Sequence, residues 1–105
     1  MYRATTPTHT YKLPIQTSEC RIIKVIYKQG AATLSKCYRD STVPDGMTLD
    51  GNKVIIKLTQ QETLMFNAKD PVRSQVRVLT EDGDVLASRR FKITVNETQD
   101  EEILT

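Results

Sequence analysis

Hydrophobic and polar residues alternate along much of the chain, and the alternation is clearest just beyond its midpoint. Val54, Ile56 and Leu58 occupy every second position, with Lys53 and Lys57 between and beside them. A period of two residues is typical of a strand that buries one of its faces. We therefore predict a strand whose three aliphatic side chains enter the core.

The residues that follow this strand predict a short helix. Thr59 is followed three positions later by Glu62. This is the pattern of a capping box, in which each side chain accepts a hydrogen bond from the backbone N–H of the other residue. Apolar residues up to Phe66 come next. We expect a helix over about 59–66 that returns apolar groups to the buried face of the strand and closes one end of the core.

The most apolar stretch of the sequence is CRIIKVIYK, which begins at position 20. Ile23, Val25 and Tyr27 share one face of this predicted strand, whereas Ile22 and Ile26 share the other face with lysines. A strand that is apolar on both faces is typical of a central position in a sheet, or of a second face that is partly covered.

Short turns separate the other predicted strands, as at Asp82-Gly83. The last strand, over 85–95, has Arg89 at a position that should face the core, so we predict a bulge or a strand end near Ser88. About six short strands with one short helix predict an all-β fold, either an antiparallel β-sandwich or a small barrel.

A length of 105 residues is that of one domain. We expect a single domain over 1–105 with an extended N-terminal arm (1–7), loosely ordered unless something holds it, and an acidic C-terminal tail (97–105). The net charge is only +2 and the basic residues are scattered, which does not favour nucleic acid as a partner. The sequence starts without the apolar run of a secretory signal, and no stretch reaches the roughly 18 apolar residues of a membrane span.

Residues with reactive side chains are few. The single histidine, His9, lies in a polar segment, and we interpret it as exposed. Cys20 and Cys37 lack the spacing and the histidine partners of a zinc site, and they are most simply two reduced thiols, with a disulfide between neighbouring strands as the alternative. We therefore assign no catalytic, cofactor-binding or metal-binding residue and expect no small-molecule substrate.

A basic patch is one alternative for the lysines of CRIIKVIYK and for the pair Arg89-Arg90. Lysines that point outward from alternating strands usually belong to an ordinary solvated face or a guarded sheet edge, and we adopt that interpretation. No aromatic residues are interleaved with them to stack on single-stranded nucleic acid.

Three surfaces remain for contact with other proteins. The threonine-rich arm either adds as a strand to a neighbour's sheet or is a disordered end. The apolar stripe on the second face of CRIIKVIYK predicts a contact with another chain, unless the arm or the tail of the same chain covers it. The apolar end of the tail docks either on a partner or on the domain itself. The candidate interaction residues are therefore Thr5, Thr6, Thr8, Ile22, Ile26, Ile103 and Leu104.

Several motifs occur in an order that resembles a known group of proteins. They are Arg3-Ala4-Thr5-Thr6-Pro7-Thr8, Tyr27-Lys28-Gln29-Gly30, the run from Leu58 to Phe66, Gln75-Val76-Arg77 before Asp82-Gly83, Ile93-Thr94-Val95, and Glu101-Glu102-Ile103-Leu104. This order resembles small proteins encoded among the tail and baseplate genes of tailed phages and prophages of Gram-positive bacteria, which are similar to the N-terminal domain of the baseplate upper protein. The resemblance covers nearly the whole chain, and the LTQQE stretch with its phenylalanine is the most specific part.

The resemblance implies an immunoglobulin-like β-sandwich and a non-enzymatic role in the virion. With this role we expect other virion proteins as partners. Self-association is a further expectation, because a small sandwich with apolar strands has edges to protect. Because the sequence starts without a secretory signal, we expect synthesis in the bacterial cytoplasm without secretion by a signal peptide. The sequence departs from the group at Cys20 and Cys37, and at Ala4, where the resemblance leads us to expect glycine.

The residues also bear on two other function classes. A carbohydrate-binding or host-recognition module on the same sandwich would need exposed aromatic side chains, and the chain has no tryptophan and only four tyrosines. An enzyme ranks lowest, because it would need His9 in a deep pocket with a carboxylate.

Overall fold

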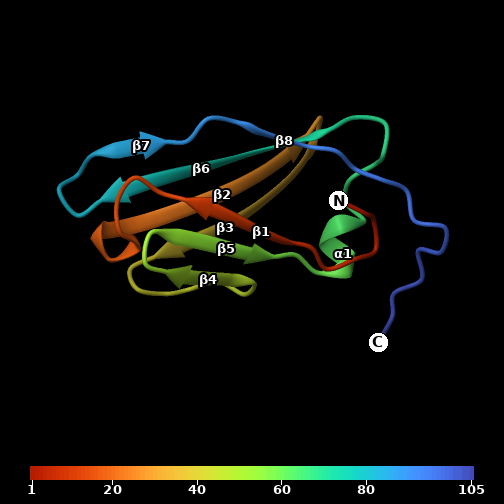
Figure 1. Cartoon of the computed structure of the whole chain (residues 1–105), viewed down its shortest axis with the longest axis horizontal. Helices are drawn as coiled ribbons and strands as arrows, with labels where there is room; N and C mark the ends of the chain where they lie inside the picture. Colours follow the sequence, from red (N-terminus) through yellow and green to blue (C-terminus); the bar gives the residue numbers. More distant parts are fainter.

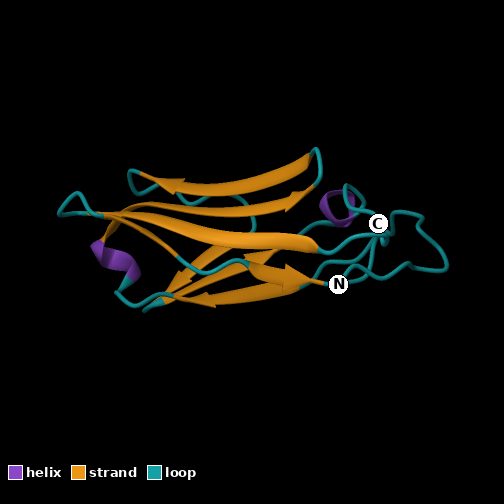
Figure 2. Ribbon diagram, turned by 90° about the horizontal axis from the view of Figure 1, so that it is seen from above, coloured by secondary structure: helices purple, strands orange, loops and turns teal.

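The computed structural model describes all residues from Met1 to Thr105 and contains two antiparallel β-sheets that pack face to face (Figures 1 and 2). One sheet has three strands in the order β1-β5-β4. The other has five strands in the order β3-β2-β6-β7, and β8 also pairs with β6. No strand belongs to both sheets, so the fold is an all-β sandwich and not a closed barrel.

The elements follow one another with short connections. They are β1 (Thr8–Lys12), a 3₁₀ turn (Thr17–Glu19), β2 (Cys20–Gln29), β3 (Ala32–Arg39), β4 (Met47–Asp50), β5 (Lys53–Lys57), α1 (Gln60–Thr63), β6 (Val72–Thr80), β7 (Val85–Ala87) and β8 (Phe91–Ile93). None of the helical segments has the length and apolar character that crossing a bilayer requires.

The core lies between the two sheets and is built by the alternation that the sequence shows. Val54 and Ile56 of β5, with Leu58 just after it, are completely buried, as predicted. Ile23 and Val25 of β2 face them from the opposite sheet and are also completely buried. Because burial of an aliphatic side chain contributes about 1.5–3 kcal/mol, this double row supplies much of the stability of the sandwich.

Helix α1 begins with the predicted capping box. The Thr59 N–H donates to Oε1 of Glu62 (2.8 Å), and the Glu62 N–H donates to Oγ1 of Thr59 (3.1 Å). The expected extent of 59–66 was too long, because the Met65 N–H bonds to the carbonyl three residues earlier and the chain tightens into 3₁₀-type turns. Phe66 is nevertheless completely buried, so the segment closes one end of the core.

The predicted irregularity in the last strand is confirmed. The segment over 85–95 is divided into β7 and β8, with Ser88 in the gap. The Val76 N–H donates to Oγ of Ser88 (3.0 Å), and the Ser88 N–H donates to the carbonyl of Val76 (2.9 Å). A side-chain oxygen thus replaces the backbone acceptor that a regular strand would offer at this point.

Candidate interaction surfaces

The N-terminal arm is held by the body of the same chain. The N-terminal ammonium of Met1 donates to the carbonyl of Thr94 (2.7 Å), and the Arg3 N–H donates to the carbonyl of Asn96 (3.0 Å). Nε of Arg3 also donates to the carbonyl of Phe66 (2.7 Å), and its guanidinium pairs with Glu101. The arm therefore connects the end of α1 to the C-terminal tail, and the two chain ends lie at the same pole of the molecule (Figure 1).

The three threonines proposed as contact residues differ in solvent exposure and in their contacts within the chain. Thr5 is partly buried, and its backbone N–H donates to Oγ1 of Thr63 (3.2 Å). Thr6 is exposed. Thr8 is exposed and starts β1, where it pairs with Lys57 across the ladder. Because β1 is an edge strand of its sheet, Thr8 borders a row of backbone groups that can pair with another strand.

The C-terminal tail lies beside α1. The Leu104 N–H donates to Oε1 of Gln60 (2.8 Å), and Nε2 of Gln60 donates to the carbonyl of Leu104 (2.7 Å). The Leu104 side chain is 71% exposed, whereas Ile103 is partly buried. The backbone of the tail is therefore docked on its own domain, and the apolar side chain at its end is presented to solvent.

Ile22 and Ile26 lie on the outer face of the five-stranded sheet and are partly buried. The strand registers place cations around them on four strands, and Leu79 and Val85 extend the row of Ile22. We call this surface the cationic face and define it by Ile22, Ile26, Leu79, Val85, Lys24, Lys28, Arg39, Arg73, Arg77 and Lys92.

Like charges lie directly opposite one another on the cationic face. Arg73 of β6 pairs with Lys28 of β2 on one side and with Lys92 of β8 on the other. Four residues along β2, Lys24 is opposite Arg77, and the pair of Ile26 and Gln75 lies between these two charge pairs on the same face. The two ion pairs of the structure, Arg3 with Glu101 and Lys36 with Glu62, are formed by residues outside this face. Cross-strand pairs of like charge destabilise a sheet, so this arrangement is unfavourable in the isolated chain.

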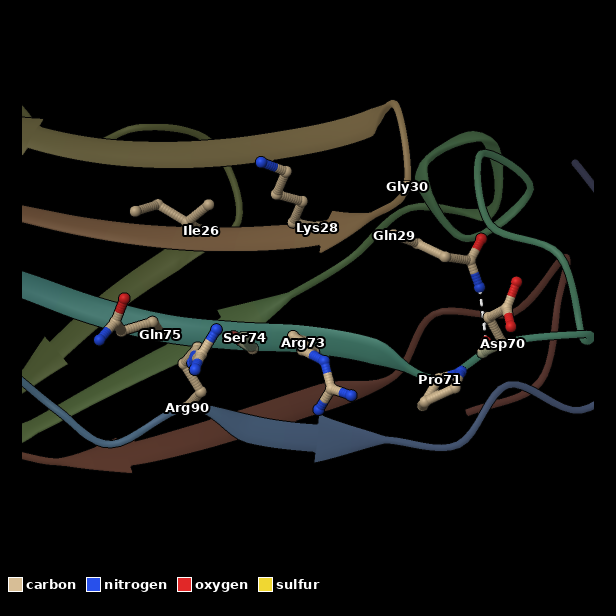
Figure 3. Close-up of a pocket in the computed structure, with 10 residues that line it drawn as sticks. All are labelled: Ile26, Lys28, Gln29, Gly30, Asp70, Pro71, Arg73, Ser74, Gln75 and Arg90. Atoms are coloured by element: carbon tan, nitrogen blue, oxygen red, sulfur yellow. Dashed lines mark hydrogen bonds between the residues drawn. The ribbon is translucent and has the colours of Figure 1, made fainter.

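A shallow hollow of about 590 Å³ lies at one end of the cationic face (Figure 3). Lys28, Arg73 and Arg90 line it, and Ile26 and Gln75 lie further along the same surface. Gln29 and Asp70 form one end of the hollow, where Nε2 of Gln29 donates a hydrogen bond to the backbone carbonyl of Asp70 (2.6 Å). Three cationic side chains line the hollow, but only one carboxylate, that of Asp70, does so. This excess of positive charge suits a ligand surface that carries negative charge.

His9 is not exposed, so that interpretation was wrong. It lies in β1, is partly buried, and its Nδ1 is hydrogen-bonded to the hydroxyl of Tyr27 (2.9 Å). Burial lowers the pKa of His9, and repulsion from the N-terminal ammonium adds to the effect. Nearby, the hydroxyl groups of Tyr11 and Ser74 are hydrogen-bonded to each other (2.5 Å) between the sheets. These contacts satisfy polar groups inside the core, where an unpaired group would cost about 1–3 kcal/mol.

The ion pair between Lys36 and Glu62 joins the edge of one sheet to α1. Lys36 lies opposite the buried Val25 in the β2–β3 ladder, so its side chain points toward the inner layer, and its Nζ is 2.5 Å from Glu62. Burial alone would raise the pKa of Glu62, but the Lys36 ammonium and the Thr59 N–H outweigh it and lower the pKa. An inward-pointing charge on an edge strand also discourages pairing of that edge with another chain.

Both cysteines are free. Cys20 is buried, and burial raises the pKa of its thiol, with further contributions from Glu19 and Glu81. Cys37 lies opposite Lys24 in the β2–β3 ladder. No group of three or more histidine, cysteine and acidic side chains is arranged to hold a metal ion.

The tyrosines do not form the exposed pair that a sugar-binding groove would favour. Tyr11 and Tyr27 are buried in the core. Tyr2 is 58% exposed and lies in the arm, whereas Tyr38 is partly buried on β3.

No protein-family model matches the chain, and no curated protein matches its sequence significantly. Of the candidate surfaces, the stripe of Ile22 and Ile26 was predicted from alternation. The arginines that face it from β6 were missed, because the pairing of β2 with β6 joins distant parts of the sequence.

Proposed function

We propose that the chain is a non-enzymatic structural or assembly protein of the tail or baseplate region of a phage or prophage particle. In this proposal it is made in the bacterial cytoplasm and is incorporated into the virion through contacts with other virion proteins. The observation that carries the contact role is the cationic face. The face places aliphatic side chains next to Arg39 and Arg77 on neighbouring strands, and arginine is enriched in protein interfaces.

The phage context is supported by the resemblance, and above all by the run from Leu58 to Phe66. In the structure this run is the segment that closes the core, because Leu58, Thr63 and Phe66 are completely buried. A sequence motif that determines the packing of the sandwich supports a shared fold with the tail and baseplate proteins it resembles. The role in a particle is the further step that we propose.

The free edges of the smaller sheet provide a second mode of contact. These edges are β1 and β4. A strand from a partner that pairs with such an edge gains affinity from backbone hydrogen bonds, and the alternation of side chains fixes its register.

Incorporation into particles tests the proposal. The gene would be replaced by an epitope-tagged copy in a lysogen, the prophage would be induced, and particles would be purified on a density gradient. We expect the tagged chain to band with the particles and to remain with tail proteins after the tails are separated from the capsids. A tagged chain that is expressed but remains in the particle-free fraction would contradict the proposed role.

A further inference from the structure

We propose that the cationic face binds the acidic C-terminal tail (97–105) of a second copy of this chain, so that copies associate head to tail. This inference deepens the proposed function, on which it rests for the premise that the chain acts through protein contacts.

The first argument is the repulsion within the cationic face. The row formed by Lys28, Arg73 and Lys92 and the pair formed by Lys24 and Arg77 hold five cations side by side. No ion pair of the structure involves any of them. Carboxylates brought by a partner would remove this repulsion and form new charge-assisted hydrogen bonds. The face is therefore better suited to the bound state than to the free one.

The second argument is that the tail matches the face in both charge and apolar character. The tail contains Glu97, Asp100, Glu101 and Glu102, has no basic residue, and continues into Ile103-Leu104. The face likewise combines cations with aliphatic side chains, since its outermost row holds Ile22, Leu79 and Val85. An acidic segment with an aliphatic end fits such a surface better than a purely charged ligand does.

The third argument is that the tail is held away from the cationic face of its own chain. Arg3 pairs with Glu101, and Gln60 makes two hydrogen bonds with the backbone of Leu104, which keeps the tail beside α1 (Figure 1). In this position Leu104 is 71% exposed, and Glu102 is also exposed. A tail that is fixed on one copy and presented at its end can reach the face of another copy. Such a contact joins two different surfaces and is therefore heterologous.

The aliphatic residues of the face argue against nucleic acid as its partner. Phosphates would use the cations but would leave Ile22, Ile26 and Leu79 without apolar contact. The outward-facing positions of β2 and β6, defined by their register, hold no aromatic side chain on which bases could stack.

A tail of nine residues forms an interface at the small end of the known range, so we expect weak and salt-sensitive association. Sedimentation equilibrium of the purified full chain over a wide concentration range measures it. At about 50 mM salt the average mass should rise above the monomer value of 11.9 kDa as the concentration increases, and at about 500 mM salt it should return to that value.

Two double variants change the charge of the two partner surfaces separately. Lys24→Glu with Arg77→Glu makes that part of the face acidic, and it keeps the repulsion within the pair, so folding should be little affected. Asp100→Lys with Glu102→Lys removes the net negative charge of the tail side chains and leaves Glu101 with Arg3. Each variant alone should associate at least about tenfold more weakly than the natural chain. An equimolar mixture of the two should associate again, because the unchanged tail of the face variant can bind the unchanged face of the tail variant.

The matched control is Lys12→Glu with Lys53→Glu. These lysines form a directly opposed pair on the three-stranded sheet, so the change in charge is the same but the cationic face is intact. The control should associate as the natural chain does. Weakening by the control to the same degree as by the face variant would overturn the proposal, as would a mixture that fails to restore association.

A monomer at every concentration in low salt would also overturn the proposal, and so would a monomer that binds a duplex oligonucleotide in the same buffer. These outcomes leave the test of the phage role intact, because incorporation into particles is measured separately on the tagged lysogen. A chain that enters particles but does not self-associate would contradict only the inference about the second copy.

Discussion

Ala4 has a backbone φ of +58°, in the left-handed region that favours glycine. This is also the position at which the resemblance to tail and baseplate proteins led us to expect glycine. The backbone of the arm turns here between the contacts of Arg3 with Asn96 and of Thr5 with Thr63. The expected glycine therefore has a physical reason, since an L-residue in this conformation is strained.

Replacing Ala4 with glycine should stabilise the protein. The left-handed conformation costs an L-residue about 1–2 kcal/mol, while glycine costs about 0.5–1 kcal/mol through the greater freedom of the unfolded chain. Ala4→Gly should thus raise the free energy of unfolding by roughly 0.5–1 kcal/mol, measured by urea denaturation. The control Ala87→Gly, in strand β7, should lower it by roughly 0.5–1 kcal/mol. Equal losses in both variants would show that Ala4 is not strained.

Glu62 links the capping box to Lys36, and it should make stability depend on pH. Folding lowers the pKa of Glu62, so its contribution is complete above the usual value near 4.5 and disappears as the pH falls through the lowered folded-state pKa. Glu62→Gln should reduce the free energy of unfolding by roughly 1–2 kcal/mol at neutral pH, because it leaves Lys36 partly buried without its partner. Denaturation across pH 3–7 should show the two proteins converging at the acid end. The exposed Glu97→Gln is the control, and it should follow the natural chain at every pH.

At the scale of the element, local pattern was sufficient for β5, for the capping box and for the break near Ser88. Each depends on residues close in sequence: alternation for β5, the Thr–Glu spacing for the cap, and the misplaced Arg89 for the break. The length of α1 was overestimated, because the apolar residues after Thr63 are also compatible with the tighter turns that the chain adopts. The sequence also could not show what holds the arm, because the residues that contact it are distant in the sequence.

The hydroxyl of Thr63 is one of the contacts that hold the arm against α1. It is completely buried and accepts a hydrogen bond from the Thr5 N–H. Thr63→Val keeps the shape and removes the hydroxyl, which should reduce the free energy of unfolding by roughly 1–3 kcal/mol. Amide hydrogen exchange should become faster in residues 1–7 than in the core strands. The exposed Thr10→Val on β1 is the control, and unchanged exchange of the arm in Thr63→Val would show that other contacts hold it.

At the scale of the whole molecule, the sandwich follows from the number, spacing and alternation of the predicted strands. The cationic face does not, because it exists only once β2, β6 and β8 are paired in a specific register. The lysines of β2 were visible in the sequence, and they were interpreted as an ordinary solvated face. The structure shows that β6 places Arg73 and Arg77 directly opposite them, and this juxtaposition gives the surface its character.

The cationic face should therefore reduce stability in the free chain and be needed for association. Arg73 is central, because it lies between Lys28 and Lys92. Arg73→Gln removes the repulsion, and Arg73→Glu replaces it with attraction on both sides. Each favourable cross-strand charge pair contributes roughly 0.2–1 kcal/mol, so the free energy of unfolding should increase from the natural chain to Arg73→Gln and again to Arg73→Glu.

The most direct test measures thermal unfolding in dilute, monomeric samples and sedimentation over a range of concentrations, for the natural chain, Arg73→Gln and Arg73→Glu at low salt. We expect the midpoint of unfolding to rise along this series while association weakens along it. A series in which Arg73→Glu is less stable than the natural chain, or in which it associates as strongly, would contradict the conclusion that this face is adapted to an acidic partner.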